Sequence, residues 1–195
     1  MMKSCKAIIR AQILQQREAL SLDESRKAAQ IIVRRILSLD VFQSSKNIAL
    51  YHAFRKEVDL QELWIAAYQL GKKTYFPVID RDSHKKTMRF LEAKPSEELH
   101  LNKFNIKEPH SNAEEIDIND LDCLCIPLVA FDRSGYRLGM GQGYYDRALA
   151  SATKRPYCVG VAYSFQQVDL LPHDPWDISL NQIVTERGSC LSSYC

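Results

Sequence analysis

Residues 135–147 read Gly135-Tyr136-Arg137-Leu138-Gly139-Met140-Gly141-Gln142-Gly143-Tyr144-Tyr145-Asp146-Arg147, and this stretch holds four of the seven glycines in the 195-residue chain. Each glycine costs conformational entropy on folding, so such a density is expected where bare backbone must approach a ligand. Because the glycines at 139, 141 and 143 lack Cβ atoms, successive N–H groups can turn toward one anion. Residues 144–150 then predict the start of a helix, whose unpaired N–H groups suit phosphate.

The spacing of these glycines matches neither of two familiar nucleotide-binding loops. No Lys-Ser or Lys-Thr follows them, and they run G-x-G-x-G instead of G-x-G-x-x-G. A tight turn between a strand and a helix, with no ligand, is the alternative interpretation. Arg137 and Asp146 favour a ligand site, because a cation and a candidate metal ligand flank the same loop.

Alternating helical and extended patterns predict the fold class. They indicate a single domain over residues 1–195, with an α/β fold in three layers (α/β/α) and a largely parallel mixed sheet. A capping box, Ser21-Leu22-Asp23-Glu24, opens the second helix. The predicted helices are 5–20, 21–39 and two that begin near Asp59 and Tyr144. The predicted strands are 48–54, 74–79, 87–91, 157–162, 182–185 and one within the apolar run 121–131, which should end at Pro127.

Three segments are expected outside this regular pattern. Residues 80–86 predict a polar turn, and residues 92–119 a long surface loop with little regular structure. The end of the chain, 187–195, is expected to be a mobile tail.

Composition excludes several classes of protein. A net charge of +2 is too small to indicate a nucleic-acid partner, and no run of about 18 apolar residues predicts a membrane span. The N-terminus has no apolar segment of the signal-peptide kind. None of the six cysteines form a C-x-x-C pair, which favours a reducing cytoplasm. We expect a monomer with a small-molecule substrate.

The first helix carries a basic face. Lys6 and Arg10 are one turn apart and share that face, which Arg17 extends. From spacing alone, a solvated basic surface is the favoured interpretation.

Polar residues also follow the strand predicted over 48–54. His52 and Glu57 lie near its carboxyl end, where ligands bind in open α/β sheets. The alternatives are a partly buried, hydrogen-bonded histidine at 52 and a solvated loop carboxylate at 57.

The glycine stretch resembles the signature of the 5-formyltetrahydrofolate cyclo-ligase family, also called methenyltetrahydrofolate synthetases. The likeness begins at Phe131-Asp132 and Gly135 and continues through Arg137-Leu138-Gly139-x-Gly141-x-Gly143-Tyr144-Tyr145-Asp146. It extends from Lys6 to about Glu186 and is weakest over 80–120. The resemblance implies a three-layer α/β/α fold and an enzyme that uses ATP and Mg²⁺ to convert a reduced folate, 5-formyltetrahydrofolate, to 5,10-methenyltetrahydrofolate.

The resemblance also implies roles for particular residues. Arg137 and Tyr144 would act in catalysis, and Asp146 and Asp177 would hold the metal. The alternatives are helix stabilisation for Asp146 and a turn residue for Asp177. The implied ATP-binding residues are Lys6, Arg10, Arg137, Leu138, Gly139, Met140, Gly141, Gln142, Gly143, Tyr144 and Tyr145; the implied substrate-binding residues are Arg10, His52, Glu57 and Tyr144.

One departure concerns the loop itself. Some family members have basic residues at the two variable loop positions, where this chain has Met140 and Gln142. Fewer cations would then face the phosphates. Two other functions stay open: a phosphosugar isomerase or acyl-group transferase on a similar sheet, and a non-enzymatic phosphate-binding module.

Overall fold

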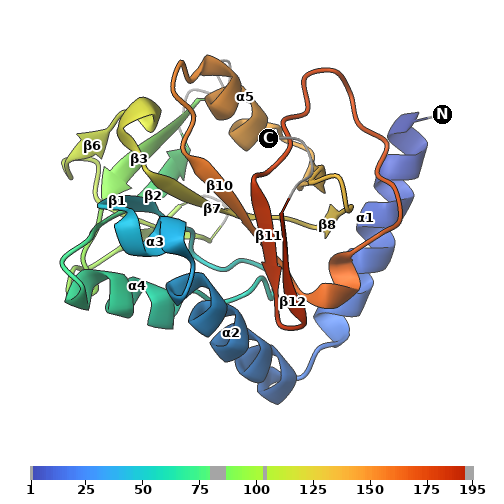
Figure 1. The fold of residues 1–195 in the computed structure, drawn as a ribbon, viewed down its shortest axis with the longest axis horizontal. Helices are drawn as coiled ribbons and strands as arrows, with labels where there is room; N and C mark the ends of the chain where they lie inside the picture. The colour runs from blue at the N-terminus through green and yellow to red at the C-terminus, as the bar shows by residue number, and fades with distance from the viewer. Residues whose placement is uncertain (1, 80–86, 103–104, 192–195) are drawn as a thin grey trace.

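The structure is a computed structural model, and it describes residues 2–79, 87–102 and 105–191. Its centre is an eight-stranded sheet in the order β12-β11-β10-β7-β1-β2-β3-β6 (Figure 1). The strands of this sheet are β1 (Asn47–Ala49), β2 (Lys73–Ile79), β3 (Met88–Glu92), β6 (Glu115–Ile116), β7 (Cys123–Pro127), β10 (Tyr157–Val161), β11 (Gln182–Thr185) and β12 (Gly188–Leu191).

Strands β11, β10, β7, β1 and β2 are parallel, whereas β12, β3 and β6 pair antiparallel at the two edges. Helices cover both faces, with α2, α3 and α4 on one and α5 on the other (Figure 1). The predicted α/β fold with a largely parallel mixed sheet is therefore confirmed. The helices are α1 (Met2–Ala19), α2 (Leu22–Leu37), α3 (Asp40–Ser44), α4 (Gln61–Gln69) and α5 (Tyr144–Ser151).

Because side chains alternate along a strand, each face of the sheet has its own apolar core. On β1 and just after it, Ile48 and Leu50 join the core under α2 and α4, whereas Ala49 joins the core under α5. Strands β2, β7, β10 and β11 also contribute to both clusters, because successive side chains point to opposite faces. The predicted capping box is also present, since Ser21 and Glu24 bond each other's backbone N–H groups at the start of α2.

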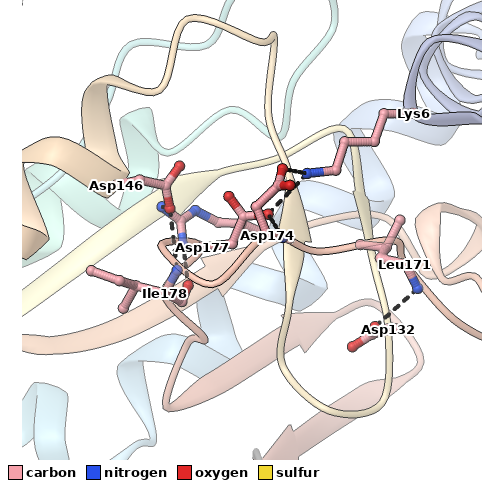
Figure 2. A network of polar contacts seen from close by, with 8 residues as sticks. Lys6, Asp132, Asp146, Leu171, Asp174, Asp177 and Ile178 are labelled. Carbon is pink, nitrogen blue, oxygen red and sulfur yellow. Dashed lines mark hydrogen bonds and ion pairs between the residues drawn. The ribbon is translucent and has the colours of Figure 1, made fainter. Parts of the chain in front are cut away.

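Helix α1 packs beside the main sheet, on a small ribbon formed by β8 (Ala130–Phe131) and β9 (Arg137–Leu138). A separate apolar cluster joins them, and it includes Ile13 of α1 and Leu138 of β9. The turn between the two strands is held by Asp132, which is 1% exposed. Its Oδ1 accepts hydrogen bonds from the backbone N–H groups of Ser134 and Tyr136, and its Oδ2 accepts one from Leu171 (Figure 2).

The segment predicted as an irregular loop contains more structure than expected. Within it, β4 (His100–Leu101) pairs with β5 (Lys107–Glu108), and β6 joins the main sheet beside β3. These strands are two residues long, too short to produce a readable pattern. The prediction for 80–86 lies outside the described residues.

The expectation of a mobile C-terminal tail is wrong for Gly188–Leu191. These residues form β12, which pairs with β11 over its whole length. The pairing was not apparent because the strand is exposed and has no apolar alternation. Residues 192–195 lie beyond the described part of the chain. Across the residues that are described, no helix is long and apolar enough to cross a membrane.

Gly160 of β10 provides a stability prediction. A Cβ atom there would lie 2.5 Å from Leu180 Cδ1, 3.1 Å from Leu128 Cδ2 and 3.2 Å from Ile183 Cγ1. We expect Gly160→Ala to lower the free energy of unfolding by about 1–3 kcal/mol, because overpacking forces neighbouring side chains to move. Denaturant titration measures this, with Gly188→Ala as the control, since a Cβ there meets nothing within 4 Å. Equal stability of both variants would contradict the prediction.

Candidate active site

The glycine loop, residues 139–143, leads from β9 into α5. Gly141 and Gly143 have φ angles of 89° and 67°, in the left-handed region that other residues rarely adopt. Gly143 is the N-cap of α5 and provides no side-chain cap. A Cβ atom on Gly139 would have no heavy atom within 4 Å. The loop therefore leaves its backbone accessible next to an uncapped helix N-terminus.

Arg10 lies against this loop from the side of α1. Its Nε donates a hydrogen bond of 2.9 Å to the carbonyl oxygen of Gly139. A Cβ on Gly141 would lie 3.4 Å from its Nη2 atom. The basic face of α1 is thus turned toward the glycine loop, and the interpretation of a purely solvated face is wrong for this residue.

Arg147 lies against the other end of the loop. Its Nη2 donates a 2.7 Å hydrogen bond to the Gln142 carbonyl oxygen, and its guanidinium carbon is 5.4 Å from the centre of the Tyr144 ring. A Cβ on Gly143 would lie 2.9 Å from its Nη1 atom. No role was predicted for Arg147 from the sequence. Its position one turn into the helix could have indicated this contact, because a side chain at that position faces back toward the loop.

The other predicted nucleotide-binding residues differ in accessibility. Leu138 is 5% exposed and packs on α1, so only its backbone can contact a ligand. Met140 and Gln142 are exposed, and Tyr144 is half-buried at the start of α5. Tyr145 packs against the core under α5, and burial raises the pKa of its hydroxyl well above the ordinary value.

Lys6 joins helix α1 to the turn before β11. Its Nζ donates hydrogen bonds of 2.7 Å to Asp174 Oδ2 and 2.9 Å to Asp177 Oδ2 (Figure 2). Burial alone would lower the pKa of the Lys6 ammonium, but the two carboxylates together raise it above its ordinary value. Asp177 also accepts a hydrogen bond from the Asp174 N–H. Sequence reasoning missed Asp174, although it lies in the same turn.

Arg137 forms a second ion pair in this region. Its Nη2 lies 2.7 Å from Asp146 Oδ1, and its Nη1 donates to the carbonyl oxygen of Ile178. The Arg137 side chain is only 4% exposed. Arg137 is therefore a buried partner of Asp146, beside the loop, and not an exposed cation.

The two predicted metal ligands lie in one polar network. Asp146 accepts a long bond from the N–H of Ile178, the residue after Asp177 (Figure 2). Within the ranges that the structure describes, no group of three or more histidine, cysteine or acidic residues could hold a metal. Two carboxylates nevertheless fit Mg²⁺, which keeps several waters and takes its remaining ligands from substrate phosphates.

His52 follows β1 and lies in an aromatic cluster. Its ring stacks on Phe76, with centroids 4.2 Å apart, and meets the edge of Trp64 at 5.5 Å. Burial, with a smaller contribution from Lys107, lowers the pKa of the imidazole to about 4. His52 Nε2 is buried with no hydrogen-bond partner among the described residues, so the expected hydrogen-bonded histidine is not observed on that nitrogen.

Glu57 is not the solvated carboxylate that its loop position suggested. Its side chain is 10% exposed, and its Oε2 accepts a 3.1 Å hydrogen bond from the Phe54 N–H. Burial raises the pKa of this carboxyl to about 7. Burial raises the pKa of the Tyr145 hydroxyl, and Glu57 adds to this rise whereas Arg137 opposes it.

Fold and site together define an α/β protein with an exposed glycine loop between paired cations and carboxylates. A family model described as the 5-formyltetrahydrofolate cyclo-ligase family matches residues 2–186. The 5-formyltetrahydrofolate cyclo-ligase of Haemophilus influenzae is 37% identical over 178 residues, 90% of this chain and 95% of that protein. The chain belongs to this family and is an enzyme of this type, which confirms the resemblance read from the sequence.

Solved structures agree with this assignment. The Aquifex aeolicus 5,10-methenyltetrahydrofolate synthetase is 34% identical, with a TM-score of 0.84 over 97% of this chain and 94% of that one. A 5,10-methenyltetrahydrofolate synthetase from Mycoplasma pneumoniae is 31% identical, with a TM-score of 0.76 over 93% of this chain and 98% of that one. These matches disfavour the isomerase, transferase and non-enzymatic alternatives.

Proposed function

We propose that the chain uses ATP and Mg²⁺ to close 5-formyltetrahydrofolate to 5,10-methenyltetrahydrofolate, releasing ADP and phosphate. The observation that carries this proposal is the glycine loop, with its left-handed glycines and the Arg10 guanidinium against it. Family membership supports the folate substrate. Phosphoryl transfer depends mainly on positioning and charge neutralisation, and this loop offers both.

In the proposed reaction, the formyl oxygen attacks the terminal phosphorus of ATP, and ADP leaves. The 10-nitrogen of the folate then attacks the activated formyl carbon and releases its proton, and phosphate departs with that oxygen. An amide oxygen is a weak nucleophile and a poor leaving group, so the phosphoryl donor must be held in line with it. No side-chain nucleophile is required.

The residues around the loop have separate roles in this proposal. Backbone N–H groups at 139–145 and the Arg10 guanidinium bind the phosphates. The Lys6 ammonium has three protons, of which Asp174 and Asp177 use two, so one is left for a phosphate oxygen. Arg137 acts in catalysis through Asp146, whose carboxylate it holds in place.

Asp146 and Asp177 would hold the metal ion. When bound, Mg²⁺ would neutralise charge on the phosphates during transfer. The pterin site would lie at the end of β1. There, Glu57 would accept hydrogen bonds from the pterin ring, His52 would line the site, and Tyr144 would pack against the folate through its ring face.

Two measurements test the proposal. Methenyltetrahydrofolate absorbance should rise with 5-formyltetrahydrofolate and Mg-ATP together, and stay flat when ATP is left out. Mg-ATP at about 100 times its dissociation constant should also stabilise the fold by about 2.7 kcal/mol. For this chain length, that corresponds to a melting shift of about 5–10 °C. Product formation without ATP, or no thermal shift even with folate present, would contradict the proposal.

A further inference from the structure

Arg17 is placed very differently from the rest of the basic face of α1. Its relative exposure is 0%, and among the described residues it is the largest side chain that is fully buried. Its Nη1 lies 3.4 Å from the Leu128 carbonyl oxygen and 3.9 Å from Glu57 Oε1. Its Nε and Nη2 atoms have no hydrogen-bond partner among the residues described. A guanidinium in this position is buried with most of its hydrogen-bonding capacity unused.

Stability alone does not explain such a residue. An arginine stays charged in proteins, and burying a charge is costly unless it is paired and hydrogen-bonded. Replacing a buried ion pair with apolar residues is often neutral or stabilising. The nearest counter-charge to Arg17 is Glu57, the carboxylate that the proposed function assigns to the pterin ring. The pair therefore has a reason to exist at the substrate site.

The surroundings of Glu57 make its ionisation depend on Arg17. Burial raises the pKa of Glu57, while Arg17 and the Phe54 N–H lower it. Among the described residues, the phenols of Tyr51, Tyr145 and Tyr163 also interact with Glu57, and Glu18 is a second acidic group that acts on Arg17. These phenols are neutral near pH 7, so Arg17 is the charge that favours the carboxylate form.

We propose that Arg17 is a positioning residue: its buried guanidinium favours and orients the carboxylate form of Glu57, which accepts hydrogen bonds from the folate ring. Arg17 itself is too buried to touch the substrate. This inference rests on the proposed function, because it assumes that Glu57 contacts the folate. It adds a residue from α1 to the substrate site, which lies at the end of β1.

The pH dependence of folate use separates this role from a purely structural one. A buried carboxyl with a pKa raised to about 7 is ionised above that pH, so kcat/KM for 5-formyltetrahydrofolate should fall as the pH drops through it. Arg17→Gln removes the cation, so the pKa of Glu57 should rise further. The acidic limb of the kcat/KM profile should then shift to higher pH by about one unit or more.

Three variants make the result specific. Arg17→Gln should raise KM for 5-formyltetrahydrofolate about 5-fold near pH 7 and leave KM for ATP unchanged, because a one-unit rise of the Glu57 pKa from about 7 lowers its ionised fraction about 5-fold at that pH. Arg17→Lys retains the charge, so its acidic limb should stay near that of the wild type. Arg26→Gln removes an equal charge from an exposed site on α2 and should change neither profile.

The double variant Arg17→Gln, Glu57→Gln covers the case in which Arg17→Gln does not fold. It leaves no unpaired buried charge, and it should match Glu57→Gln alone in KM for folate. Additive effects of the two substitutions would overturn the proposal. The proposal would also be overturned if the acidic limb of the kcat/KM profile of Arg17→Gln superposed on that of the wild type. Failure of the proposed function is seen separately, as a wild type that forms no product with Mg-ATP.

Discussion

Asp146→Asn is expected to lower turnover by about 10²–10³-fold, the scale of losing a preorganised electrostatic group. Asp146 Oδ1 lies 2.7 Å from Arg137 Nη2, and the Arg137 side chain is 4% exposed. The substitution therefore removes the charge that would face Mg²⁺ and also leaves a buried guanidinium without its counter-charge. Product formation measured against Mg²⁺ concentration tests this, and high Mg²⁺ should recover part of the loss.

The competing interpretation is that Asp146 only stabilises its helix. A carboxylate in the first turn of a helix contributes about 0.3–1 kcal/mol through the dipole. Asp23→Asn is the matched control, because Asp23 is an exposed acidic residue in the first turn of α2, and its turnover should be unchanged. If Asp146 and Asp177 share a metal, the double asparagine variant should cost less than the sum of the singles. Strict additivity with no Mg²⁺ dependence would exclude a shared metal.

Arg10→Ala is expected to raise KM for ATP by about 10- to 100-fold, the range of a hydrogen bond to a charged group. The effect has two parts. The cation next to Gly141 is lost, and so is the bond from Nε to the Gly139 carbonyl oxygen. The second loss should cost about 1 kcal/mol of stability, which lowers the melting temperature by about 2–4 °C.

Arg10→Lys separates these two parts. Lysine keeps the charge but has no planar fork, so it should recover only some of the ATP affinity. Arg26→Ala, at an exposed site on α2, is the control for loss of an arginine from a helix surface. Full activity of Arg10→Ala at limiting ATP would show that Arg10 supports the loop backbone and does not bind phosphate.

The fold was readable from the sequence where the pattern is local. The capping box at Ser21 and the strand Gln182–Thr185 were found in place, because each depends on residues that are neighbours in the chain. Strand β12 and the short strands of 92–119 were missed, because they are only two to four residues long and their own residues carry little pattern. Edge strands of this kind are specified by the sheet that they join.

In the site, too, local features could be predicted from the sequence and features that depend on tertiary contacts could not. The glycines of the loop could be recognised, since two of them have the left-handed φ angles that their density suggested. The environments of the charged residues could not. Helical spacing places Lys6, Arg10 and Arg17 on related faces of α1. Their tertiary contacts differ, because Lys6 bonds Asp174 and Asp177, Arg10 bonds the glycine loop, and Arg17 is buried in the core. Burial of a charge is a property of the whole fold.

The contacts of α1 also bear on when this site can form during synthesis. Lys6 bonds Asp177, which follows it by 171 residues in the chain, and Arg10 bonds Gly139. The first helix therefore leaves the ribosome long before its partners exist. Chains are made at about 5–20 residues per second, so α1 waits roughly ten seconds or more for the loop and the turn that it contacts. Completion of the candidate site is thus among the last steps in the folding of this chain, although the site uses some of the first residues.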